Sequence, residues 1–297
     1  MTLAIASPAP SALKAGLVMI VAMASFTAGD TMTKLMAGEV PVGQIIFFRG
    51  IVATTLTAFI ARKVLAQAIL ALQKGVVVRS LCDVAGTIFF ITALMHIPIA
   101  NLTSVMQAVP LLVIAFAAMF LGEKVGWRRI LAILAGLTGV LFVVKPSPAS
   151  FTIYDALSLG LIMAIALRDI FTRRLNFDVP TMIIVFANAV FVMLSGLALY
   201  PFEDWVALAP RHMMLISGGG MFLSLGYVCM VSTIRMGDIS ATAIYRYSVV
   251  LFALLSGMLV FGEFPDQWAI IGIALIVASG IYALLREMRV NRRKNQE

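Results

Sequence analysis

Polar side chains that could hold a solute lie inside long apolar stretches of this chain, and Arg246 stands out among them. It lies between Tyr245 and Tyr247, with no carboxylate within one helical turn. A guanidinium group offers five fixed donors and stacks on aromatic rings, so this arrangement favours a binding role. The structural alternative is a contact across the molecule, either with a backbone carbonyl or with Asp83, which lies four residues after Arg79. We interpret Arg79 and Asp83 themselves as a structural pair.

Two amides, Asn101 and Gln107, share another apolar stretch, in which Pro110 follows three residues after Gln107. Proline removes the helical hydrogen bond to the Met106 carbonyl, so we expect a kink there. The kink either exposes acceptor groups to a central cavity or only fits the helix to its neighbours. The predicted solute-binding residues are Arg246, Tyr245, Tyr247, Gln107, Asn101 and Tyr227, with Asn188 as a further candidate.

Acidic and basic side chains form two further groups, which we interpret as gating or coupling residues. Asp30 and Lys34 are four residues apart on one helical face, and Arg49 lies about 10 Å into the next apolar stretch from the same side. Asp30 can therefore pair with either Lys34 or Arg49. Asp169 and Arg173 repeat the pattern near the opposite end of the molecule. These groups either close the two mouths of a cavity or are static ion pairs that orient the helices.

The stretches that must position these residues are membrane-spanning helices. The chain has 297 residues, of which 62% are hydrophobic and 12% charged, whereas soluble proteins have roughly 45–50% and 25%. This excludes a soluble enzyme and, despite the net charge of +8, a nucleic-acid binder. A helical span needs about 20 apolar residues. Ten such spans are predicted at 16–37, 42–61, 76–95, 100–121, 128–145, 154–173, 180–200, 212–234, 240–261 and 267–286.

The distribution of basic residues predicts the orientation in the membrane. Of 22 Lys and Arg residues, 16 fall in segments on the N-terminal side, two on the other side and four within spans. The positive-inside rule then places both termini in the cytosol. Residues 1–15 are predicted to be a disordered cytosolic N-terminus and 287–297 a basic cytosolic tail.

The two halves of the chain resemble each other. The pattern of acid, base, acid-Val-Pro and Phe at 30–47 recurs at 169–186, shifted by 139 residues, and the Gly-Glu pair at 122–123 recurs at 262–263. This predicts one five-helix repeat over 16–148 and a second over 149–286. Since five is odd, the second repeat enters the membrane from the opposite face, and inverted repeats are typical of alternating-access transporters.

The ten spans, the inverted repeat, Pro41 with Phe48-Arg49 in the second span, and the Gly-Glu pair closing the fourth and ninth spans resemble the EamA-type family of the drug/metabolite transporter superfamily. The resemblance implies an all-α bundle of ten transmembrane helices. It also implies a central cavity lined mainly by the first, third, fourth, sixth, eighth and ninth spans, and gradient-coupled movement of a small metabolite. No phosphate-binding Gly-x-x-x-x-Gly-Lys motif occurs in the sequence.

The predicted function is secondary transport across the inner membrane by alternating access, with a small-molecule substrate and the lipid bilayer as partners. Paired acids and bases beside aromatic faces suit a neutral planar solute, and uptake of riboflavin is the first hypothesis. The alternatives are transport of an amino acid or a derivative such as S-adenosylmethionine, export of a metabolite or drug, and a channel. No catalytic motif, metal cluster or cofactor site is predicted, and the protein is expected to be a monomer or homodimer.

Overall fold

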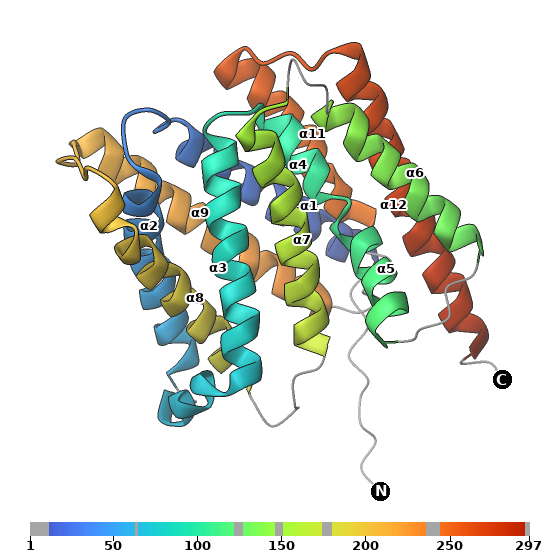
Figure 1. Ribbon diagram of the computed structural model, residues 1–297. Coiled ribbons are helices and arrows are strands. Elements are labelled where there is room, and N and C mark those ends of the chain that lie inside the picture. Colours follow the sequence, from blue (N-terminus) through green and yellow to red (C-terminus); the bar gives the residue numbers. More distant parts are fainter. Residues whose placement is uncertain are drawn as a thin grey trace, which may run out of the picture.

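The structure is a computed structural model that describes residues 12–62, 65–121, 127–145, 151–173, 180–235 and 244–294. These residues form a bundle of helices (Figure 1). The first half contains α1 (Ala12–Lys34), α2 (Val42–Ala61), η1 (Leu65–Leu72), α3 (Lys74–Leu94), α4 (Ile99–Met106), α5 (Val109–Leu121) and α6 (Trp127–Val144). The second half contains α7 (Ile153–Arg173), α8 (Thr181–Ala198), η2 (Tyr200–Phe202), α9 (Pro210–Arg235), η3 (Ile244–Tyr247), α11 (Ser248–Ser256), η4 (Gly257–Phe261) and α12 (Gln267–Lys294).

The all-helical membrane fold predicted from the sequence is confirmed. Within the described residues, eight helical segments are long and apolar enough to cross a membrane, and Ile130–Val144 in α6 is a shorter apolar helix. With α7, which packs inside the bundle, they account for the ten predicted spans.

The ends of the chain differ from the prediction. α1 begins at Ala12, so residues 12–15 are helical, while the rest of the predicted N-terminal segment lies outside the described residues. α12 continues to Lys294, so most of the predicted basic tail is the last part of a helix. A short 3₁₀ helix, η1, also occupies the connection between α2 and α3, where the sequence predicted a loop.

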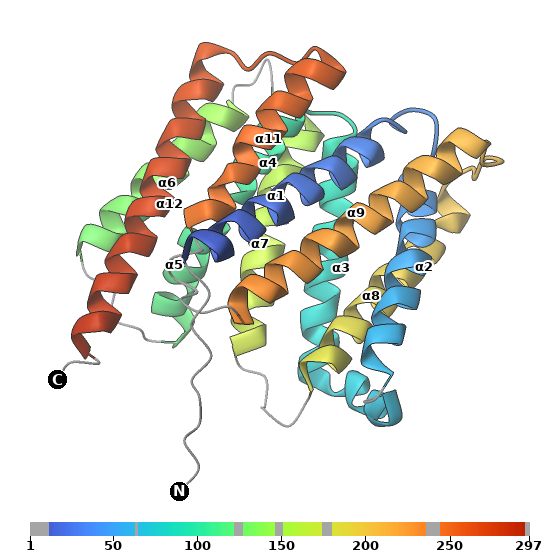
Figure 2. The ribbon, with the colours of Figure 1, turned by 180° about the vertical axis from the view of Figure 1, so that it is seen from behind.

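The helices pair across the two halves in a pattern with two-fold pseudo-symmetry. α1 packs against α9, and α7 packs against α3. The other two extensive pairs, α2 with α8 and α6 with α12, each join corresponding helices of the two halves. Figure 2 shows α1 and α9 side by side, both inclined to the neighbouring helices. The inverted repeat therefore places the first and third helices of each half at the contact between halves.

Glycines allow several of these helix pairs to approach backbone to backbone. A Cβ atom at Gly196 in α8 would lie 2.5 Å from the Phe47 amide nitrogen and 2.6 Å from the Gly43 carbonyl oxygen of α2. A Cβ at Gly139 in α6 would likewise lie 2.7 Å from the Gly272 carbonyl oxygen of α12. Because lipid offers little hydrophobic driving force for helix association, close packing at small residues contributes much of the stability.

The fourth and ninth spans are both interrupted. The predicted kink is confirmed, since the fourth span divides into α4 and α5 at Gln107–Ala108, just before Pro110. The Gln107 and Ala108 amides donate to the carbonyls of Ser104 and Val105 and form a tighter turn there. The ninth span runs through the 3₁₀ turn η3, the α-helix α11 and the π-helix η4. Irregular helices inside membrane bundles are typical of ligand-binding regions.

The glycine contacts lead to a prediction about stability. Gly196→Ala should lower the melting temperature of the detergent-purified protein, because the new methyl group would overlap α2 and overpacking costs about 1–3 kcal/mol. Gly86→Ala in α3 is the matched control, since its Cβ would lie 3.4 Å from its nearest neighbour, Ile165. Equal melting temperatures for the two variants would show that the contact between α2 and α8 is looser than described.

Candidate functional site

Lys34, the last residue of α1, joins three segments that are distant in the sequence. Its buried ammonium group forms an ion pair with Glu263 and donates to the Ile97 carbonyl at 2.6 Å. The second carboxylate oxygen of Glu263 accepts the Ile99 amide at 3.0 Å, at the start of α4. We call these residues the Lys34–Glu263 cluster. It ties α1 to α4 and to the segment that follows η4.

A hydroxyl pair extends this connection. Thr31 in α1 and Ser256 at the end of α11 share a hydrogen bond of 2.6 Å. Sequence reasoning missed Glu263 as a site residue and used it only as part of the repeated Gly-Glu pair. That repetition was the available signal, because a charged residue kept at the end of a span in both repeats requires a partner.

Arg49 in α2, and not Lys34, is the partner of Asp30. The Arg49 Nη2 atom lies 3.5 Å from Asp30 Oδ1, while Nη1 donates to the Thr33 hydroxyl at 2.9 Å. Arg49 is 9% exposed, and within the described part of the chain its buried Nε atom has no hydrogen-bond partner. The two sequence alternatives for Asp30 are thus resolved in favour of the pair between helices.

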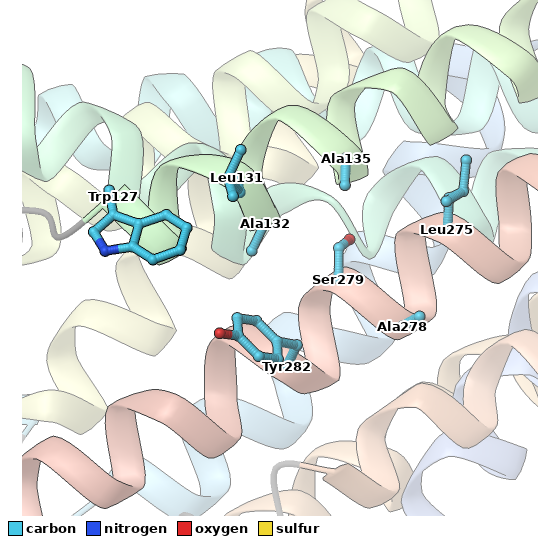
Figure 3. A pocket seen from close by; sticks show the side chains of 8 residues that line it. All are labelled: Trp127, Leu131, Ala132, Ala135, Leu275, Ala278, Ser279 and Tyr282. Carbon is cyan, nitrogen blue, oxygen red and sulfur yellow. The ribbon is translucent and has the colours of Figure 1, made fainter.

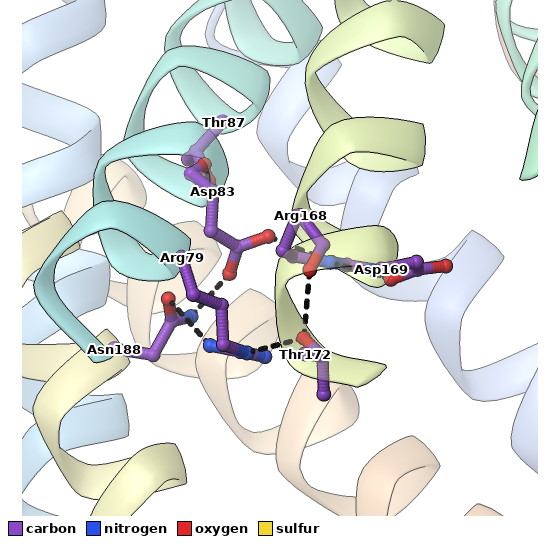
Figure 4. Close-up of polar contacts among 7 residues, drawn as sticks. All are labelled: Arg79, Asp83, Thr87, Arg168, Asp169, Thr172 and Asn188. Carbon is purple, nitrogen blue, oxygen red and sulfur yellow. Dashed lines mark hydrogen bonds and ion pairs between the residues drawn. The ribbon is translucent and has the colours of Figure 1, made fainter. Parts of the chain in front are cut away.

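A second charged group, the Asp83–Arg168 cluster, joins α3, α7 and α8 (Figure 4). Arg168 Nη1 donates to Asp83 Oδ1 at 2.6 Å, and the Asn188 amide donates to the other oxygen of Asp83. Arg168 also pairs with Asp169, at 2.8 Å from Nη2 and 2.9 Å from Nε. Asp169 is therefore paired within its own helix with Arg168, and the side chain of its predicted partner Arg173 lies outside the described residues.

Arg79 completes this cluster. Its Nε atom donates to the Thr172 hydroxyl at 2.9 Å, and Nη1 lies 3.4 Å from the Asn188 side-chain oxygen. The predicted structural pair of Arg79 and Asp83 is thus replaced by contacts from both residues to α7 and α8. Arg168 forms the ion pair with Asp83, which removes the alternative that Asp83 pairs with Arg246.

The two repeats use equivalent positions differently. The 139-residue shift relates Thr33 to Thr172 and Arg49 to Asn188. In the first repeat, Thr33 accepts the guanidinium of Arg49 from the adjacent helix of the same repeat. In the second repeat an amide stands at that position, and Arg79 crosses from the first repeat to bond Thr172 and Asn188. The Asp83–Arg168 cluster therefore links the halves, whereas the Asp30–Arg49 pair lies within one half.

Tyr227 in α9 lies within electrostatic reach of residues from both groups of charges. Its ring contacts Phe26 edge-on, with the ring centroids 5.2 Å apart. The side chain interacts electrostatically with Asp83, Arg168 and Arg49, although the residue is 52% exposed. The half-exposed Tyr227 side chain thus faces a region near charges of α2, α3 and α7. We call this region the interhelical space.

The other predicted binding residues do not converge on one point. Arg246 is exposed, and the ring of Tyr245 lies over Gly16 of α1. Tyr247 is buried, with its hydroxyl beside Gly280 of α12. The structure thus places these three consecutive residues of η3 in three different environments.

The two predicted amides lie on the interrupted fourth span. Asn101 is in the first turn of α4, and its side-chain oxygen is buried without a hydrogen-bond partner among the described residues. Gln107 lies at the break between α4 and α5. The residues of the charged clusters also come from the second and seventh spans, as Arg49 of α2 and Asn188 of α8, and the family resemblance had not included these spans among the cavity-lining helices.

A groove of about 400 Å³ lies away from these residues, between α6 and α12 (Figure 3). It is lined by Trp127, Leu131, Ala132, Ala135, Leu275, Ala278, Ser279 and Tyr282. Its mainly apolar lining and exposed rim suit lipid chains better than a polar solute. None of the predicted site residues lines it, and in the part of the chain that the structure describes no group of His, Cys, Asp or Glu could hold a metal ion.

The ten-helix bundle with paired charges between its halves defines a membrane transporter of the inverted-repeat class. The model of the EamA-like transporter family matches residues 13–145 and 152–285. This chain therefore belongs to the EamA-like transporter family and is a multi-pass membrane protein.

Several characterised relatives span nearly the whole chain. The pseudopaline exporter of Pseudomonas aeruginosa is 30% identical over 284 residues, covering 91% of this chain and 95% of that protein. The S-adenosylmethionine uptake transporter of Rickettsia bellii is 22% identical and covers 93% of this chain and 94% of its own. The riboflavin transporter of Brucella anthropi is 24% identical, with coverage of 92% and 99%. A protein crystal structure with 19% identity aligns at a TM-score of 0.63, covering 94% of this chain and 99% of that one.

The interhelical space leads to a prediction about labelling. In a protein lacking Cys82 and Cys229, Tyr227→Cys should react with a hydrophilic maleimide faster than Val228→Cys, because thiolates form only where water reaches them. Tyr227 and Val228 are equally exposed, at 52% and 51%, but Val228 follows Tyr227 on a different face of α9. Similar labelling rates at the two positions would show that Tyr227 faces lipid.

Proposed function

We propose that this protein is a secondary transporter that moves a small zwitterionic, amino-acid-derived metabolite by alternating access. The observation that carries this proposal is the presence of both signs of charge within the bundle: Asp30 of α1 pairs with Arg49 of α2, and Asp83 of α3 pairs with Arg168 of α7. Intramembrane charges are costly and mark substrate or ion pathways. A substrate carrying both an ammonium and a carboxylate group can interact with both signs.

The relatives support a metabolite of this class. S-adenosylmethionine, which the Rickettsia protein takes up, is an amino-acid derivative. The relatives include both an exporter and uptake transporters, so similarity to them does not determine the direction of transport. Riboflavin is the second candidate substrate, because the Brucella relative transports it and the Tyr227–Phe26 contact offers aromatic faces. For riboflavin, the proposed contact is Tyr227 or the exposed Arg246, because the predicted binding residues do not converge on one point.

Alternating access requires that each end of the bundle can close. We propose that the Lys34–Glu263 cluster closes one end and the Asp83–Arg168 cluster closes the other. The connections from α1 to α2 and from α11 to α12 lie at the upper end in Figure 1, whereas η1, next to the start of α3, lies at the lower end. With cytosolic termini, as the basic residues predict, the Lys34–Glu263 cluster lies on the outer side.

The substrate class can be tested in membrane vesicles of both orientations. We expect saturable movement of labelled S-adenosylmethionine that is stimulated by unlabelled substrate on the opposite side, as in a carrier. A channel would show no such stimulation. Riboflavin is assayed in parallel, together with growth of a riboflavin auxotroph at limiting vitamin concentrations. Transport of riboflavin alone, lost in Arg246→Ala at equal expression, would replace the zwitterion with the flavin.

The outer gate can be tested with the labelled cysteine at position 227. Glu263→Gln should increase labelling of Tyr227→Cys by an impermeant maleimide in intact cells, because neutralising Glu263 removes the ion pair that ties α1 to the segment after η4. Glu203→Gln is the control. Glu203 lies in the segment between η2 and α9 and accepts a hydrogen bond from the Gly43 amide of α2, so the same change is made outside the Lys34–Glu263 cluster. An increase seen only in inside-out vesicles would reverse the proposed orientation, and no increase in either would exclude Glu263 from the gate.

A further inference from the structure

The two ion pairs around the interhelical space differ in how fully they are satisfied. Asp83 uses both carboxylate oxygens, one with Arg168 at 2.6 Å and one with the Asn188 amide. Asp30 and Arg49 share only one contact, at 3.5 Å, which is the outer limit for a hydrogen bond. The first pair is fully hydrogen-bonded, whereas the second has unused capacity.

The unused capacity of Arg49 lies on one edge of its guanidinium group. Nη1 is held at 2.9 Å by Thr33, whose hydroxyl donates in turn to the Gly29 carbonyl at 3.0 Å. Nε, on the same edge as Nη2, is buried and has no hydrogen-bond partner among the residues that the structure describes. A buried donor without a partner is unfavourable, and this one is carried by a residue that is only 9% exposed. A ligand that supplies two acceptor oxygens would satisfy this edge.

We propose that the charged head group of the substrate binds between Asp30 and Arg49. The carboxylate of the zwitterion accepts hydrogen bonds from Nε and Nη2 of Arg49 in the bidentate geometry that guanidinium and carboxylate groups share. The ammonium group donates to Asp30, which gives up its long contact with Arg49. This assignment rests on the proposed function, because it assumes a zwitterionic substrate.

The position of Asn188 indicates a single head-group site in each chain. Asn188 occupies the place in the second repeat that Arg49 occupies in the first, and its amide is engaged with Asp83. Asp169, the counterpart of Asp30, is held by Arg168. The second repeat therefore offers neither a free guanidinium edge nor a loosely held carboxylate at the equivalent position.

The test is a melting-temperature titration of the purified full-length protein with S-adenosylmethionine. Wild-type protein should be stabilised by S-adenosylmethionine and far less by its decarboxylated analogue. In Arg49→Gln and Asp30→Asn the apparent Kd should rise about tenfold or more, as expected for the loss of a charge-assisted hydrogen bond. Arg49→Lys should retain part of the affinity. Arg62→Gln makes the same change at the end of α2, where the guanidinium lies over the Phe59 ring, and should bind like wild type.

A measurement without ligand distinguishes binding from a structural role. Arg49→Gln should lower the melting temperature less than Arg168→Gln does, because Asp30 would lose only a contact of 3.5 Å whereas Asp83 would lose a close partner. An equal loss in both variants would show that the Asp30–Arg49 pair is structural. Undiminished binding to Arg49→Gln would place the head group elsewhere and leave the proposed function intact. Failure of wild-type protein to bind S-adenosylmethionine, together with riboflavin transport, would reject both proposals.

Discussion

The cost of placing charge in hydrocarbon determines how this bundle is assembled. An ionised side chain inside the membrane needs a partner, and an unsatisfied backbone group costs several kcal/mol. In this chain the charges therefore face one another across helices: Lys34 reaches Glu263, and Arg168 reaches Asp83. Each ion pair fixes which helices are neighbours, and the glycine contacts fix how closely they pack. Since lipid surrounds the apolar faces, these polar links supply the specificity that hydrophobic burial gives a soluble protein.

Duplication explains the architecture, and departures from symmetry explain the site. Both repeats provide an acid and a threonine in their first helix, at Asp30 and Thr33 and at Asp169 and Thr172. Only the first repeat places an arginine opposite them, in its second helix. The replacement of that arginine by Asn188 lets Arg79 and Asp83 bind across the boundary between halves. In the second repeat, this group of residues has thus become a link between the two repeats. In the first repeat, the equivalent group retains the loosely satisfied Asp30–Arg49 pair.

The sequence was sufficient for the features that local physics determines. Apolar runs set the spans, Pro110 set the break in the fourth span, and helical depth brought Arg49 level with Asp30. The contact of Lys34 with Glu263 could not be derived in this way, because the two residues are 229 positions apart. At such a separation, sequence spacing does not distinguish Glu263 from the other acidic residues. Likewise, three adjacent side chains around Arg246 suggested one site, but the short 3₁₀ turn directs them to different neighbours.

A transporter must hold its substrate less firmly than it holds itself together, and the two kinds of ion pair meet these opposite requirements. A saturated pair such as Asp83–Arg168 gains little from a solute, because a ligand would have to displace hydrogen bonds as good as its own. A pair held at 3.5 Å, as in Asp30–Arg49, loses little when a zwitterion enters, so part of the cost of desolvating the ligand is offset. The same looseness limits the affinity for the ligand, because Asp30 and Arg49 can pair with each other again when the ligand leaves. Fold and binding thus both depend on ion pairs, which are fully hydrogen-bonded where they hold the bundle together and loosely held where they bind the substrate. This difference allows both functions in one apolar bundle.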